Sequence, residues 1–272
     1  MVGSESRREP GAGVGAGNCA GLTLTHPNWR KALALCFALV GAGTIVPAAQ
    51  ADQSFLLLKL DGAYVKWGKP VLGTGAKVRY ALLAERREFS GARNCGDMTS
   101  LEPALQREGI ASEQLRAETA AAFAMWQRAA NIEFEAVDNP DQADIVIGAQ
   151  SIPAGRAFAN VTYRKDEQGV TRRIDKALVC LNPRQPWKVG FGGNANAYDL
   201  RYTIAHEIGH AIGLNHPGPS GQLMGFKYAE AFRGLQTGDL GGAVALYGSR
   251  DGSTAASMPP ARTTQPAGMG LR

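Results

Sequence analysis

The residues best suited to chemistry lie between positions 206 and 216, where the sequence reads His-Glu-Ile-Gly-His-Ala-Ile-Gly-Leu-Asn-His. His206 and His210 are four residues apart, so on a helix both imidazoles project from one face and can bind one metal ion. Gly213 allows the chain to leave that helix in a conformation that other residues resist. His216 can then supply a third nitrogen. Three protein ligands with one open position are typical of a catalytic zinc site.

Glu207 follows the first histidine and lies where its carboxylate can reach a metal-bound water. Zinc lowers the pKa of such a water to about 7 and polarises a carbonyl group. Glu207 would take the water proton as a general base and deliver it to the leaving amine. The predicted reaction is therefore peptide-bond hydrolysis without a covalent intermediate. The competing interpretation, a helix with surface histidines, explains less, because every histidine after residue 51 falls in this motif.

The motif needs a helix to position its first two histidines, and the pattern predicts one over residues 200–213. Helices are also expected over 112–131, with Ser112 as N-cap, and over 237–247. The buried face of the first of these is expected to hold Leu115, Thr119, Ala122, Phe123 and Trp126. A hairpin over 55–66 should turn at Asp61-Gly62. The expected strands are 77–83, 132–137, 143–148, 157–163 and 174–181, and the mixed segment 84–111 is expected to be a loop. These elements predict a mixed α/β domain.

Composition limits the class of protein. The chain has 272 residues and a net charge of +5, from 29 basic against 24 acidic residues, and 44% of its residues are hydrophobic. These values are typical of a globular protein. No run of five or more basic residues occurs, so nucleic acid is not an expected partner.

Residues 1–51 have the pattern of a leader with a signal peptide. Basic residues at 30–31 precede an apolar run over 32–47, and Ala49-Gln50-Ala51 forms a small-residue cleavage site. A membrane anchor is the alternative, but the run is shorter than the roughly 20 residues that a span requires and contains Pro47. We expect cleavage after Ala51, secretion to the periplasm or the medium, no stable membrane anchor and a monomer. Residues 249–272, rich in small residues and proline, are expected to be a disordered tail.

The extended histidine motif resembles that of the metzincin metalloproteases, and within them the matrixins. Gln222-Leu223-Met224-Gly225 lies where metzincins have their Met-turn, and Met224 would pack below the zinc site without binding the ion. Residues 122–126, 143–147, 235–239 and 245–248 resemble further matrixin segments. The resemblance implies a catalytic domain over 52–248, with a twisted, mostly parallel sheet, long helices, a zinc-site helix and a Met-turn. It also implies a zinc-dependent endopeptidase that acts on peptides or proteins. A serralysin-type relative is the alternative suggested by His216-Pro217, but Phe226 stands where that group has tyrosine.

Two departures from the matrixin pattern bear on metal and activation. Animal matrixins hold a second zinc with further histidines, whereas this chain has Gly155-Arg156-Ala157-Phe158 where one ligand is expected, so we expect one zinc. Only about 25 residues separate Ala51 from the first expected core strand, so no pro-domain is expected.

Cys95 and Cys180 are the two cysteines that remain after the leader. Two cysteines in an exported chain most simply form one disulfide. Here it would join the segment before the first helix to a central strand. The alternative is that residues 93–97 resemble the cysteine-switch segment of matrixin zymogens, although the spacing differs. The disulfide is the interpretation that we favour.

Substrate and calcium sites are further implications of the resemblance. The substrate would lie along an edge strand near 157–161 and extend the sheet. Asp138, Asp141 and Asp144 could hold calcium as matrixin loops do, although such acids are more often simply solvated. Tyr228 could approach the oxyanion from beyond the Met-turn. Two alternatives to the endopeptidase remain: a non-catalytic, zinc-stabilised binding module, which would not need Glu207, and a zinc hydrolase that acts on cell-wall peptides.

Overall fold

The computed structural model describes residues 55–218, 221–231 and 233–251. All of them belong to one compact unit, Pro47–Arg272. The expected signal peptide, and all of the expected tail after residue 251, lie outside the described residues. Within those ranges, no helix combines the length and the apolar character that crossing a membrane requires.

A nine-stranded sheet forms the centre of the unit. Its main path, in spatial order, is β2 (Lys59–Leu60), β3 (Ala63–Lys66), β10 (Thr171–Leu181), β8 (Ile145–Gln150), β4 (Ala76–Leu82) and β7 (Ile132–Ala136). The pairs from β3 to β7 along this path are all parallel. The short strands β5 (Arg87–Glu88) and β6 (Asp97–Thr99) join antiparallel beside β8. The predicted mixed α/β class, with a mostly parallel central sheet, is confirmed.

Strand β9 (Ala157–Tyr163) runs antiparallel to β10 and pairs with no other strand of the described chain. Its second edge is therefore free, as the resemblance to matrixins implied for residues 157–161. Two short pairs lie outside the main sheet. They are β1 (Leu56–Leu57) with β13 (Leu214–Asn215), and β11 (Trp187–Lys188) with β12 (Tyr198–Asp199).

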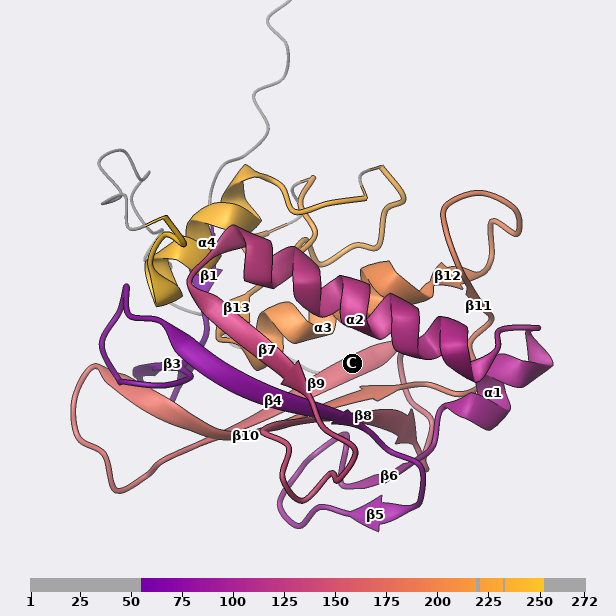
Figure 1. Cartoon of the computed structure of the whole chain (residues 1–272), viewed down its shortest axis with the longest axis horizontal. Helices are drawn as coiled ribbons and strands as arrows, with labels where there is room; N and C mark the ends of the chain where they lie inside the picture. Colours follow the sequence, from indigo (N-terminus) through magenta and orange to yellow (C-terminus); the bar gives the residue numbers. More distant parts are fainter. Residues whose placement is uncertain (1–54, 219–220, 232, 252–272) are drawn as a thin grey trace, which may run out of the picture. The chain divides into compact units, whose positions relative to one another are not determined.

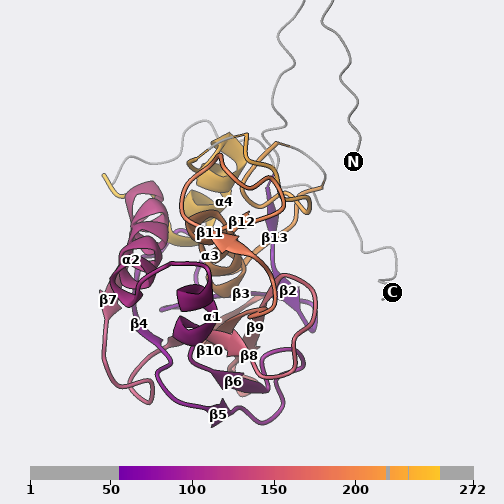
Figure 2. The same cartoon turned by 90° about the vertical axis from the view of Figure 1, so that its right-hand side faces the viewer.

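Two long helices, α2 (Ser112–Ala129) and α3 (Leu200–Ala211), run side by side over one face of the sheet (Figures 1 and 2). The predicted inner face of α2 is buried, and Trp126 Nε1 donates a hydrogen bond to Ala205 O of α3 at 2.8 Å. Helix α4 (Thr237–Tyr247) follows the site and packs near β1. The apolar spacing of three and four residues thus packs the metal-site helix against both α2 and the sheet.

The central strands are buried on both faces, as parallel strands usually are. In β8, Ile145 and Ile147 join the core under the helices, whereas Val146 joins a second cluster on the opposite face. Cys95 and Met98 belong to that second cluster. The segment before α1 (Glu102–Arg107) therefore covers the far side of the sheet.

Three local predictions were wrong in detail. Residues 84–111 are not a plain loop, since β5, β6 and α1 lie within them; elements of two to six residues show no periodicity to read. The central sheet includes the hairpin strands β2 and β3, which precede the strand expected first, because β3 pairs with residues 171–173 at the start of β10. The N-cap of α2 is Ala111, whose N–H donates to Gln114 Oε1 at 3.0 Å. The hairpin turn at Asp61-Gly62 is confirmed, with φ values of 46° and 80°.

Candidate metal centre

Helix α3 carries the first two histidines and starts at a well-defined cap. The Asp199 carboxylate accepts a hydrogen bond from Tyr202 N at 2.8 Å and another from Gly190 N at 2.6 Å. Such a cap satisfies backbone donors that the helix leaves without partners. His206 and His210 then lie one turn apart on the same face of a nearly fully buried helix.

Gly213 ends the helix and redirects the chain towards the site. Its φ is +106°, and a β-carbon at this position would lie 2.2 Å from Val65 O. Only glycine fits both constraints. The chain then forms β13, which pairs with β1 and brings His216 back opposite the helix.

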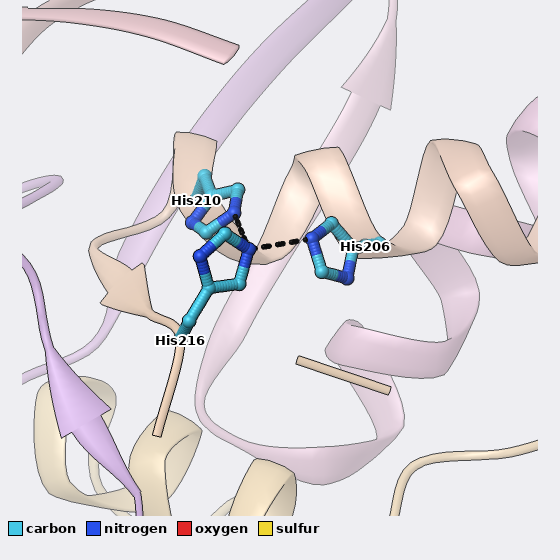
Figure 3. Close-up of side chains that lie close together, drawn as sticks. All are labelled: His206, His210 and His216. Carbon is cyan, nitrogen blue, oxygen red and sulfur yellow. Dashed lines mark hydrogen bonds between the residues drawn. The ribbon is translucent and has the colours of Figure 1, made fainter. Parts of the chain in front are cut away.

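The three imidazoles converge, as Figure 3 shows. His216 Nε2 lies 3.0 Å from His206 Nε2 and 3.0 Å from His210 Nε2. His206 Nδ1 lies 2.6 Å from Leu223 O, and His210 Nδ1 lies 2.9 Å from Leu214 O. These carbonyls accept, so the protons are on Nδ1 and the Nε2 lone pairs of these two rings face the centre.

Electrostatics favour the metal-binding form of this cluster. Burial lowers the pKa of His206 and of His210, and it lowers the pKa of His216 to about 4. The imidazoles are therefore neutral at neutral pH, as metal ligation requires. Three imidazole nitrogens that converge in this way can bind one cation, and zinc at its usual distance of roughly 2 Å from each nitrogen fits this donor set. Within the described chain this is the one group of such side chains close enough to share an ion.

Glu207 lies beside the triad and opens into the same cleft. Its side chain is 5% exposed, and burial raises the pKa of its carboxyl to about 8. The cleft has a volume of about 600 Å³ and is lined by the three histidines, Glu207, Phe226, Leu58, Leu60 and residues 156–161. The free edge of β9 therefore forms one wall of the cleft that holds the candidate metal ligands.

The turn below the site is built around Met224. Gly225 N donates to Gln222 O at 3.0 Å, and Met224 is 2% exposed. The Asp239 carboxylate, in the first turn of α4, accepts hydrogen bonds from Leu223 N at 2.9 Å and Met224 N at 3.0 Å. Asp239 thereby fixes the carbonyl of Leu223 that orients His206. The sequence interpretation gave Asp239 no role of its own, because only the folded chain brings it to the turn.

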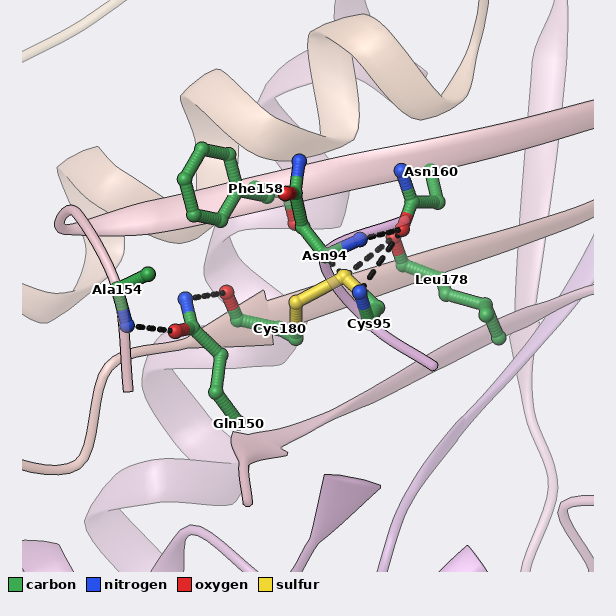
Figure 4. The surroundings of a disulfide bond; sticks show 8 residues. All are labelled: Asn94, Cys95, Gln150, Ala154, Phe158, Asn160, Leu178 and Cys180. Carbon is green, nitrogen blue, oxygen red and sulfur yellow. Dashed lines mark hydrogen bonds between the residues drawn. A yellow bond between two sulfur atoms is a disulfide. The ribbon is translucent and has the colours of Figure 1, made fainter. Parts of the chain in front are cut away.

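Cys95 and Cys180 form a disulfide, and both are completely buried. Asn160 of β9 accepts hydrogen bonds through Oδ1 from Asn94 N at 3.0 Å and Cys95 N at 2.9 Å (Figure 4). The cysteine-switch alternative is wrong for this structure, since Cys95 has no free thiol to offer a metal. The disulfide segment instead supports the edge strand from the far side of the sheet.

The residues expected to hold calcium, and Tyr228, have other partners in the structure. Asp141 pairs with Arg87, and Asp144 Oδ2 accepts from Arg79 N at 2.7 Å, so the structure does not bring the acids at 138–144 together as a metal-ligand group. The Tyr228 hydroxyl donates to Glu230 Oε1 at 2.7 Å and accepts from Asp199 N at 2.7 Å. These bonds hold Tyr228 at the start of α3, and they do not aim it at an oxyanion.

A mixed sheet covered by two helices, with three converging histidines and a methionine turn beneath them, defines a metalloprotease-type domain. Residues 101–248 match the matrixin family, and the chain belongs to that family. Matrixins are zinc metalloendopeptidases that bind a catalytic zinc.

Similar proteins include a probable matrix metalloproteinase, 095L, of Invertebrate iridescent virus 3. It is 25% identical over 147 residues, which are 51% of this chain and 39% of the relative. Karilysin of Tannerella forsythia is 29% identical over 136 residues, 47% of this chain and 27% of the relative. Matrix metalloproteinase-19 of Mus musculus is 41% identical over 64 residues, 23% and 12% respectively. The chain thus matches well under half of the length of each relative.

Proposed function

We propose that this chain is a secreted, zinc-dependent endopeptidase with residues 52–248 as its catalytic domain. One observation carries the proposal: the three imidazoles and the Glu207 carboxyl open into one cleft whose wall is a free strand edge. A binding module would have no need for a buried carboxyl next to the metal ligands, because burying such a group costs stability.

His206, His210 and His216 would hold one zinc ion. Bound there, zinc would supply Lewis acidity and a water with a pKa near 7. Glu207 would accept a proton from water in the cleft and pass it to the leaving nitrogen. Burial raises the pKa of its carboxyl to about 8, and a bound cation would lower it towards the range in which a group both takes and gives a proton near neutral pH. Met224 would support the site from below without binding the ion.

The substrate would be an extended peptide that lies along β9 and adds a strand to the sheet. The free edge of β9 supplies backbone donors and acceptors over 157–163, so main-chain hydrogen bonds would hold peptides of varied sequence. Secretion would follow cleavage after Ala51. The Cys95–Cys180 disulfide supports export, because such bonds persist in oxidising compartments.

The test compares the wild-type chain with Glu207→Ala, and with Glu135→Ala as a control at an exposed position outside the cleft. Bound zinc is measured by elemental analysis and cleavage with a mixed peptide library. We expect about one zinc in each protein and cleavage by the wild type and the control only. If all three bind zinc and none cleaves a peptide, the proposal fails and a zinc-stabilised binding module becomes the better account. Cleavage of cell-wall peptides alone would narrow the substrate class.

A further inference from the structure

Arg156 stands at the entrance to β9 and lines the cleft beside the candidate metal ligands. Two hydrogen bonds from Asn182 hold the backbone of Arg156 and of the residue before it. Asn182 N donates to Arg156 O at 2.9 Å, and Asn182 Nδ2 donates to Gly155 O at 2.7 Å. Arg156 is the one lysine or arginine among the described residues that line this cleft, where apolar side chains predominate.

Two tyrosines hold the side chain of Arg156 in one orientation. Its guanidinium carbon lies 5.1 Å from the ring centroid of Tyr198 and 5.1 Å from that of Tyr228. The two rings themselves meet edge to face at 5.1 Å. A guanidinium stacked in this way loses little further freedom when it binds a ligand.

No acidic side chain of the described chain forms an ion pair with Arg156, and its buried Nε has no hydrogen-bond partner. Glu230, which bonds to the neighbouring Tyr228, is already paired with Lys188 at 2.8 Å. Arg156, Glu207 and the three histidines line the same cleft, so this charge lies beside the candidate metal ligands. A partly buried cation without a counter-charge is costly unless a ligand supplies one.

We propose that Arg156 binds a carboxylate of the peptide substrate and makes the enzyme prefer an acidic group close to the scissile bond. The inference rests on the proposed function and adds the class of substrate. The planar guanidinium matches a carboxylate with two parallel hydrogen bonds, which a neutral amide of the same shape cannot accept equally well. The carboxylate is either an acidic side chain or the free C-terminus of a short peptide.

The test uses the full chain and pairs of peptides that differ by Glu or Gln at one position, which is moved along an otherwise uncharged sequence. A second set pairs a free C-terminal carboxylate with its amide. We expect the wild type to prefer the acid at one position, in one of the two sets, by about 10- to 100-fold in kcat/KM. In Arg156→Gln this preference falls to about 1, because cleavage of the acid peptide falls by a larger factor than cleavage of the uncharged peptide. The set that responds identifies the source of the carboxylate.

Arg172→Gln is the matched control. Its Nε is also buried without a partner, and its guanidinium lies 5.2 Å from the Tyr163 ring, but it does not line the cleft. We expect the control to keep the acid preference. Arg156→Glu should reverse the preference, towards a peptide with Lys at the same position.

Several results would overturn the inference. A wild type with no preference for the acid does so, as does a preference that survives in Arg156→Gln. Equal losses on the acid and amide peptides would assign Arg156 to packing alone. The same peptide pairs are titrated onto Glu207→Ala by calorimetry, so that recognition is measured without turnover. If the wild type cleaves no peptide but binding still prefers the acid, the proposed hydrolysis is wrong and the recognition of a carboxylate by Arg156 still holds.

Discussion

The sulfur of Met224 lies where a side chain at Gly209 would have to go. A β-carbon on Gly209 would be 2.2 Å from Met224 Sδ and 2.9 Å from Trp126 Cζ2. Gly209 lies between His206 and His210 on α3. The Met-turn and α2 therefore both contact α3 at the turn that carries the two histidines. Met224 can pack below the site only because residue 209 has no side chain.

Gly209→Ala is expected to lower the free energy of unfolding by about 1–3 kcal/mol, because the new methyl group overpacks this contact. It should also weaken zinc binding, since relief of the clash moves the helix that carries His206 and His210. Chemical denaturation and a zinc titration measure the two effects.

Gly234→Ala provides the control, since nothing lies within 4 Å of a β-carbon at that position. In the double variant Gly209→Ala/Met224→Ala the sulfur is gone, so we expect a smaller loss than the sum of the two single changes. Strict additivity of the two losses would mean that the two residues do not restrict each other.

Asp239 is expected to be a major support of the Met-turn. Its carboxylate accepts from Leu223 N, Met224 N and, at 2.8 Å, Gln236 N. Asp239→Asn turns one acceptor into a donor that faces an N–H group, which should reduce the free energy of unfolding by at least about 2 kcal/mol. Asp175→Asn, which removes an exposed pair with Arg164, should cost less than about 1 kcal/mol. Similar losses from the two changes would contradict the special role of Asp239.

The disulfide should stabilise the domain mainly by restricting the unfolded chain. The bond spans a sequence separation of 85 residues, so the variant Cys95→Ala/Cys180→Ala should lose about 2–5 kcal/mol in the free energy of unfolding. Because both cysteines are fully buried, a reductant should leave the folded wild type intact and act only once it unfolds. Rapid reduction of the folded protein, followed by thiol labelling, would speak against this burial.

Lys66 predicts a dependence of stability on pH. It is fully buried in β3, and its Nζ donates to Trp67 O at 2.7 Å and Lys69 O at 2.8 Å. Burial lowers the pKa of this amine from 10.5 to about 8. Between these values the unfolded chain binds more protons than the folded one, so the cost of burying the charge disappears as the pH rises.

Relative to Lys66→Met, the wild type should therefore gain up to about 1.4 kcal/mol per pH unit between pH 8 and pH 10.5. The difference should be constant below pH 8. Urea denaturation of both proteins across this range measures it, and other titrating groups cancel in the comparison. A constant difference over the whole range would show that the amine titrates normally.

Most of the fold could be predicted from the sequence because the patterns that indicate helices, strands and turns are local. The apolar spacing in α2 and α3, the alternation in β7 and the turn at Asp61-Gly62 each depend on neighbouring residues, and the helix predicted over 200–213 is observed over Leu200–Ala211. The histidine spacing likewise depends on one helix turn and one glycine. These features could be read without knowing what packs against them.

Other features depend on contacts between distant segments. Asp239 looks like an ordinary acid at the start of a helix, and Arg156 like a surface residue before a strand. Their surroundings come from the Met-turn in one case and from Tyr198 and Tyr228 in the other. The segment 84–111 was missed for a related reason, since β6 is stabilised by its partner β8 and not by its own pattern.

The bonds of Asp239 also bear on how this protein can change. Leu223 and Met224 at one end of a surface loop, and Gln236 at the other, are held by one carboxylate. The segment between them carries Phe226, whose ring centroid lies 5.4 Å from that of His216, and Tyr228, which accepts a hydrogen bond from Asp199 N, so changes nearer Gln236 should disturb the histidines least. One carboxylate thus lets that part of the loop vary while both ends of the loop, and with them the carbonyl that orients His206, stay in place.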